Sequence, residues 1–391
     1  MAINFEQVFD KITQIGMGAR TRQEHLGGLH ERAHQLLDSW ANNTSELRDK
    51  VERARQADSN IRCALPLEDR LDASNPEPAI QNSVTLLAAD GSQILPDRHA
   101  SILYSMVNVG AIAIQPGSGQ PPAVFTDSSL FFADELYTET GMLTGESIEQ
   151  SRDIAERMKL LELVPDYPAP LIALTDGPVE LWGAKNGGEG DYRKNLEIHK
   201  SILSQLQANN VTVAGYVDKP GADLVVRTLE IAQLSSDEEY QNIRKLHNLR
   251  GVTDRWLFSF LHGGYRSAVF GLQSSSRLHY TGDLALHFFY LNVGDTKHPS
   301  LVRVEFPRWV AEDSVKLNIL HAALLQQCWV MGARPYPYIL HRAHEIAVVK
   351  YEEKRQVEQM LELELRRSGA EIEEGSNKQS AKDLPGTTRT K

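Results

Sequence analysis

Cysteine is nearly absent from this chain of 391 residues, which contains only Cys63 and Cys328. Two distant cysteines cannot supply a disulfide framework, nor the closely spaced ligands of a structural zinc site. The first residues also lack the basic and apolar regions of a secretory signal. No apolar run approaches the length of about 20 residues that a membrane-spanning helix needs. These absences predict a cytoplasmic protein with no membrane partner.

Positive charge is also scarce. The chain has 41 Lys and Arg against 52 Asp and Glu, which gives a net charge of −11. This excludes a uniformly basic surface for binding nucleic acid. A local basic channel is still compatible, because net charge governs solubility and steering rather than a specific site.

What the sequence does contain is two apolar runs that each lead into Asp-Gly, at Leu86–Ser92 and Leu171–Pro178. Each run predicts a buried strand with its aspartate at the tip, where the glycine lets the chain turn. Two such strands side by side would bring Asp90 and Asp176 together. Neighbouring carboxylates repel unless a proton or a divalent cation lies between them, and Mg²⁺ and Mn²⁺ favour such oxygen donors. An ordinary turn is the alternative for each Asp-Gly.

The periodicity of apolar residues predicts the other elements. Residues 1–80 read as a helical N-terminal extension and linker, residues 81–367 as one domain, and residues 368–391 as a disordered tail. Within the domain we expect helices at 146–164, 192–208, 310–330 and 340–367, a helical insertion at about 223–261, and strands at 100–114, 211–217, 266–270, 287–293 and 301–306. This order predicts an α/β fold with a mixed sheet flanked by helices.

Three further side chains are candidates for the chemistry of a site. Glu156 lies at the edge of the apolar stripe of the helix at 146–164, where a solvated glutamate is the ordinary alternative. Tyr336 and His344 lie near the C-terminus, and His344 could equally be an ordinary helix histidine. Carboxylates around a divalent ion can orient water and a phosphate, while a histidine can ligate the metal or pass a proton.

The order of the motifs resembles the NurA nuclease family, DNA-end-processing enzymes of archaea and bacteria. The resemblance covers about residues 80–365. It is carried by Ala89–Ser92, Thr175–Gly177, Ala214–Pro220, Asp254–Phe258, Gly264–Ser267, Phe288–Asn292, Arg303–Pro307, Tyr336–Tyr338 and Ala343–Glu345.

The resemblance implies an RNase H-like fold and a Mn²⁺-dependent deoxyribonuclease, with Mg²⁺ as a possible substitute. It implies 5′-to-3′ exonuclease and single-strand endonuclease activity on DNA, in end resection and double-strand break repair. It also implies a homodimer and a hexameric HerA-type ATPase as partner. The helical N-terminal segment and the last helix could help two chains pair, or could simply cover this chain's own sheet.

The resemblance also assigns roles to residues. Asp90 and Asp176 correspond to the metal-binding aspartates, and Tyr336 and His344 to the C-terminal Tyr and His of the site, with His344 also a metal ligand. The helix glutamate of the site corresponds to Glu156, with Glu149 and Glu162 as alternatives. Pro178 departs from the family, which more often carries Ser at that position.

Two other functions are compatible with parts of this pattern. An actin-like phosphotransferase also uses Asp-Gly turns, but the turn after Asp90 lacks a Gly-rich phosphate loop. A catalytically silent DNA-binding scaffold would have no use for a complete ligand set. Mn²⁺-dependent release of nucleotides, ATP turnover, or neither would distinguish the three.

Overall fold

The computed structural model describes residues 3–67, 69–79, 84–138, 141–183 and 189–370. These fall into two compact units: unit 1 comprises residues 1–80 and 215–336, and unit 2 comprises residues 81–214 and 337–391. The predicted extent of one domain over 81–367 stays a prediction. The predicted disordered tail lies outside the described residues from position 371 onward. No helix within the described part of the chain is both long and apolar enough to cross a membrane.

Unit 1 contains antiparallel strands that are almost entirely buried. Their order is β1 (Cys63–Pro66), β9 (Phe270–Gln273), β10 (Leu286–Asn292), β11 (Leu301–Pro307) and β8 (Thr212–Val217), which enters from unit 2. The strand predicted at 266–270 is wrong, because β9 begins only at Phe270. Arg266 instead forms isolated bridges with Asn75 and Leu291.

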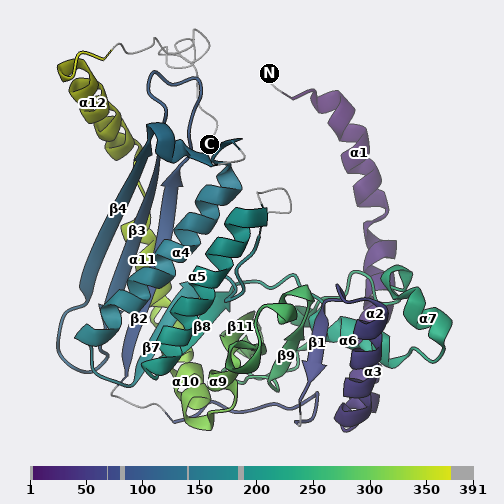
Figure 1. The fold of residues 1–391 in the computed structure, drawn as a ribbon. Helices are drawn as coiled ribbons and strands as arrows, with labels where there is room; N and C mark the ends of the chain where they lie inside the picture. Colours follow the sequence, from purple (N-terminus) through teal and green to yellow (C-terminus); the bar gives the residue numbers. More distant parts are fainter. Residues whose placement is uncertain (1–2, 68, 80–83, 139–140, 184–188, 371–391) are drawn as a thin grey trace. The chain divides into compact units, whose positions relative to one another are not determined.

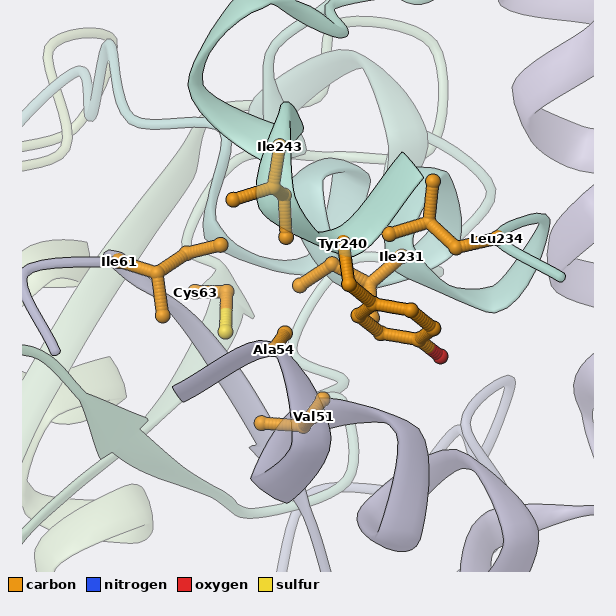
Figure 2. Close-up of a cluster of buried hydrophobic side chains, with 8 residues drawn as sticks. All are labelled: Val51, Ala54, Ile61, Cys63, Ile231, Leu234, Tyr240 and Ile243. Carbon is orange, nitrogen blue, oxygen red and sulfur yellow. The ribbon is translucent and has the colours of Figure 1, made fainter. Parts of the chain in front are cut away.

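The N-terminal helices of unit 1 are α1 (Phe5–Met17), α2 (Ala19–Trp40) and α3 (Thr44–Ala57). Helix α3 buries one face in a cluster that Figure 2 shows, where Val51 and Ala54 meet side chains of β1 and of the segment that follows β8. This cluster comprises Val51, Ala54, Ile61, Cys63, Ile231, Leu234, Tyr240 and Ile243. Helix α3 is therefore part of the core of its own unit, whereas α1 has no buried residue.

The remaining helices of unit 1 are mostly short. The segment predicted as a helical insertion holds α6 (Leu224–Ala232), α7 (Asp237–Gln241), α8 (Asp254–Leu257) and the 3₁₀ turn η3 (Ile243–Lys245). Beyond it lie η4 (Ser275–Leu278), η5 (Gly282–Leu284), α9 (Arg308–Ala311) and the long, apolar α10 (Ser314–Val330).

Unit 2 has a mixed sheet with helices on both faces. Its strand order is β7 (Leu171–Asp176), β2 (Thr85–Ile94), β3 (Tyr104–Ile114) and β4 (Ala123–Phe132). Strands β2 and β7 are parallel, and the pairs β2–β3 and β3–β4 are antiparallel. Helices α4 (Gly145–Leu163) and α5 (Glu189–Ala208) lie side by side over the sheet (Figure 1). Smaller elements are η1 (Ala133–Leu136), β5 (Tyr137–Thr138), β6 (Gly141–Met142) and η2 (Val164–Asp166).

Helix α11 (Tyr338–Ala347) covers the opposite face of this sheet from α4. A side chain at Gly91 would point at α4, whereas one at Gly110 would meet the backbone of α11 at Ile346 and Ala347. Because neighbouring strand positions alternate between faces, Asp90 faces α11 while Gly91 faces α4.

Two sequence predictions fail in unit 2. Strand β2 does not end at Asp90 but continues to Ile94, because its residues stay paired with β3 throughout. The last helix is not continuous either, since α11 ends at Ala347 and α12 (Tyr351–Arg367) begins four residues later. The Ser92 hydroxyl donates to the Ala347 carbonyl at 2.5 Å, and the Asn108 amide donates to the same oxygen at 2.7 Å. These two side chains of the sheet supply hydrogen bonds to the carbonyl oxygen of the last residue of α11, and the helix ends there.

Candidate active site

Asp90 and Asp176 occupy adjacent positions on two parallel strands. The register pairs Ala89 of β2 with Thr175 of β7, and each aspartate is the next residue along. Parallel neighbours at equivalent positions point to the same face and lie roughly 4.8 Å apart between strands. The alternation of the two apolar strands therefore brings the two carboxylates together at the point where β7 ends.

Asp90 is fixed at both carboxylate oxygens. Its Oδ1 accepts the Gly91 amide N–H at 2.9 Å, and its Oδ2 lies 2.7 Å from Nδ1 of His344. The histidine comes from α11, and its side chain is 63% exposed while that of Asp90 is 17% exposed. Helix α11 thus places a solvent-accessible imidazole against the carboxylate of Asp90.

Glu156 reaches the same place from α4, on the other face of the sheet. It is 5% exposed, so the alternative of a solvated glutamate is wrong. The missing side chain of Gly91 makes room for it, since a Cβ there would lie 2.8 Å from Oε1 of Glu156. By contrast, Glu149 is exposed, and Glu162 is exposed and pairs with Lys159.

The pKa of Glu156 is raised to about 8, mainly by burial. The carboxylates of Asp153 and Asp90 also raise it, whereas the nearby Arg157 and Arg152 lower it. Burial and the neighbouring carboxylates together outweigh the two cationic side chains and favour the protonated form of Glu156.

The four side chains line one hollow of about 380 Å³ within unit 2. The hollow is polar, and acidic and basic side chains of β2, α4, β7 and α11 line it. Its lining comprises Asp90, Gly91, Arg152, Asp153, Glu156, Arg157, Asp176, Pro178, Glu180, Trp182 and His344.

Arg152 is a residue of the hollow that the sequence reasoning missed. Its guanidinium donates to Oε1 of Gln93 at 2.7 Å and to Oδ1 of Asp153 at 3.0 Å, and its Nε lies 3.3 Å from Oε1 of Glu156. The spacing of four residues between Arg152 and Glu156 on a predicted helix is the signal that could have found it.

Arg157 was missed as well. It is buried, and its guanidinium donates to the carbonyls of Asp153 at 2.8 Å and of Pro178 at 3.2 Å. It thereby ties α4 to the turn after β7. Pro178 contributes only its backbone carbonyl to this contact, which any residue at that position could supply.

Tyr336 belongs to unit 1, where its ring lies 5.4 Å from that of Tyr216, edge to face. Its place in the site together with His344 stays a prediction.

The residues of the hollow fit a divalent cation by their chemistry. Carboxylate oxygens and an imidazole are donors that Mn²⁺ accepts, and a cation would stabilise the ionised form of Glu156, which burial disfavours. Among the described residues, however, no three His, Cys, Asp or Glu side chains are already set as ligands of one metal ion. His344 is instead engaged with Asp90.

The sequence matches the family model for the NurA domain over residues 84–349. The structure is similar to the crystal structure of the NurA nuclease from Sulfolobus solfataricus, with a TM-score of 0.50 and 10% identity over 93% of this chain and 98% of that one. A crystal structure of NurA with manganese is 11% identical over 74% of this chain and 91% of that one, with a TM-score of 0.36.

RNase H1 from Halobacterium salinarum NRC-1 matches 34% of this chain and 84% of its own, with 17% identity and a TM-score of 0.21. No match is found among curated proteins. The predicted α/β fold with a mixed sheet flanked by helices and the predicted nuclease class are confirmed. Because the family model spans most of its length, the chain belongs to the NurA nuclease family.

Proposed function

We propose that this chain is a divalent-metal-dependent DNA nuclease that hydrolyses phosphodiester bonds at the hollow of unit 2. The observation that carries the proposal is the convergence of Asp90, Glu156, Asp176 and His344 on that single hollow from β2, α4, β7 and α11. Membership of the NurA family supplies the substrate class.

In this proposal Asp90, Glu156 and Asp176 hold the metal, with His344 as a further ligand. A bound Mn²⁺ or Mg²⁺ would polarise the phosphate and lower the pKa of an attacking water. The hydrogen bond from Gly91 and the contact with His344 orient the Asp90 carboxylate. Tyr336 positions the phosphate or the attacking water.

Family membership is the basis on which we propose a finer activity. We propose 5′-to-3′ exonuclease and single-strand endonuclease action in DNA end resection during double-strand break repair. We also propose a hexameric HerA-type ATPase as the partner that supplies DNA.

We further propose a homodimer in which α1 contributes to the contact between chains. Phe5, Phe9 and Ile12 on this helix are 64%, 66% and 58% exposed. Exposed apolar side chains gathered on one helix mark an interaction surface. Removing residues 1–17 should therefore weaken association, whereas removing residues 1–65 would also destroy the core that α3 forms with unit 1. Light scattering that finds a concentration-independent monomer for the full chain would rule the dimer out.

The test of the nuclease proposal is an assay on DNA labelled at the 5′ or the 3′ end, with Mn²⁺, Mg²⁺ or a chelator. We expect cleavage with Mn²⁺ and none with the chelator, and the labelled products report the polarity. ATP turnover without cleavage would support the phosphotransferase instead. DNA binding without metal binding or cleavage would support the silent scaffold.

A further inference from the structure

A second groove lies directly beyond the active-site hollow in unit 2. Its volume is about 470 Å³, and it is lined by residues 92–97, which continue β2, and by residues 348–351 with Lys354, at the junction of α11 and α12. We call it the strand-end groove. It begins two residues after Asp90 and four residues after His344, so the same two elements that carry catalytic candidates lead into it.

The walls of the strand-end groove combine positive charge with an aromatic ring. Lys350 and Lys354 line it, and Asp97 is the one acidic residue of its described lining. Within the described part of the chain, the Lys350 ammonium has no ion-pair partner, and that of Lys354 lies 3.7 Å from Oε1 of Glu358. Tyr351 is 53% exposed. In a chain with net charge −11, a groove whose lining carries more basic than acidic side chains is a local exception.

The floor of this groove packs against the sheet of unit 2. Ile94 packs in a buried cluster with Tyr104 and Met106, and Val349 packs against that cluster. The Ser92 hydroxyl also accepts the Val349 amide N–H at 3.3 Å. The lysines and the tyrosine are therefore mounted on backbone that the sheet holds in place, rather than on a free loop.

Basic side chains along a path, with an aromatic face for stacking, are the ingredients of a binding site for single-stranded nucleic acid. Stacking on Tyr351 needs a base whose face is free, which a paired duplex does not offer. The four steps from Asp90 to Ile94 span about 13 Å along the strand. At a rise of about 3.4 Å per nucleotide along the axis of a stacked strand, this is on the order of four nucleotides.

We propose that the strand-end groove binds the single DNA strand that enters or leaves the cleavage site, over about four nucleotides. Lys350 and Lys354 contact its phosphates, and Tyr351 stacks on a base. This inference rests on the proposed function, because it takes the hollow at Asp90 as the place of cleavage.

The first test measures binding without cleavage, using the full chain, a chelator, and fluorescent DNA single strands of 12 and 3 nucleotides. The variant Lys350→Ala/Lys354→Ala loses two phosphate contacts. Each contact on a single strand contributes about 0.7 to the slope of log affinity against log salt. We expect a slope smaller by about 1.4 and an affinity for the 12-mer about 25-fold weaker at 0.1 M salt.

The matched control is Lys194→Ala/Lys200→Ala, which removes the same charge from α5, outside the groove lining. It should change the affinity for the 12-mer less than about 2-fold. Equal weakening by both variants, or an unchanged slope in the groove variant, would overturn the proposal.

A second test addresses the ring. Tyr351→Ala should weaken binding of the 12-mer about 5- to 10-fold, whereas Tyr351→Phe, which keeps the stacking face, should bind like the wild type. Equal losses in both variants would contradict stacking. Circular dichroism checks that each variant is folded. If the Ala variant is not folded, the Phe variant still tests the proposal, because a loss of binding in that variant would contradict stacking.

Cleavage assays separate this inference from the proposed function. With Mn²⁺, the advantage of the 12-mer over the 3-mer in kcat/KM should shrink about 25-fold in the double lysine variant. If the wild type cleaves neither strand, the proposed function fails, although the binding result stands. If the wild type cleaves but the length advantage is the same in the variant, the groove proposal fails alone.

Discussion

The strands β2 and β7 both carry Asp-Gly after an apolar run, yet the two glycines serve different purposes. Gly177 ends β7 with φ of +85°, and a Cβ there would meet nothing within 4 Å. Gly91 lies inside β2, paired with Val109, where a Cβ would overlap Arg152 and lie 2.8 Å from Glu156. The first glycine supplies backbone freedom, and the second supplies space.

This difference explains how the site acquires its third carboxylate. Because β2 continues past Asp90, α4 can lie along it and place Glu156 against the gap at Gly91. Strand β7 stops at Asp176, which leaves that carboxylate at the open end of the hollow. One aspartate is thus enclosed and the other accessible.

The largest expected effect tests what the two strands share. Asp90→Asn and Asp176→Asn should each lower kcat at least about 100-fold, equivalent to about 2.7 kcal/mol in the barrier, because the amide keeps the shape but removes the charge that the metal needs. Steady-state cleavage with Mn²⁺ measures this, and circular dichroism checks the fold. A variant that keeps more than about a tenth of the wild-type activity would remove its aspartate from the site.

The second-largest effect tests which glutamate of α4 contributes to the site beside β2. Of Glu149→Gln, Glu156→Gln and Glu162→Gln, only Glu156→Gln should lose activity, by about 10-fold or more, because it alone is buried at the hollow. The other two variants are matched controls on the same helix. Normal cleavage by all three would show that α4 contributes no ligand.

The third effect tests the space at Gly91. Gly91→Ala should displace Glu156 and Arg152 and reduce cleavage about 10-fold, with overpacking costing about 1–3 kcal/mol of stability. Titration with Mn²⁺ should show weaker metal binding in the same variant. Unchanged activity and metal affinity would mean that α4 can shift without consequence for the site.

The smallest effect tests the conformation at Gly177. Gly177→Ala meets no neighbouring atom but forces a Cβ into the left-handed region. We expect the free energy of unfolding to fall by about 1–2 kcal/mol, measured by urea denaturation. No loss of stability, or a loss of Mn²⁺ affinity as large as that of Gly91→Ala, would erase the distinction between the two glycines.

Much of the fold was predictable because it depends on local patterns. Buried strands read as apolar runs, and α4 and α5 as stripes with helical spacing, so their positions followed from the sequence. The break between α11 and α12 was not predictable, because Ser92 and Asn108 of distant strands end α11. The late start of β9 likewise depends on the bridges that Arg266 makes with distant segments.

For the site, the sequence by itself predicts which residues bear the chemistry: the motifs and the family resemblance point to Asp90, Asp176, Glu156 and His344. Only the tertiary structure decided how they are held. Of the three candidate glutamates of α4, the structure buries only Glu156, and it places Arg152 and Arg157 in the lining of the hollow. The physical reason is that burial, pairing and pKa arise from segments far apart in the chain, whereas apolar periodicity is a property of each segment alone.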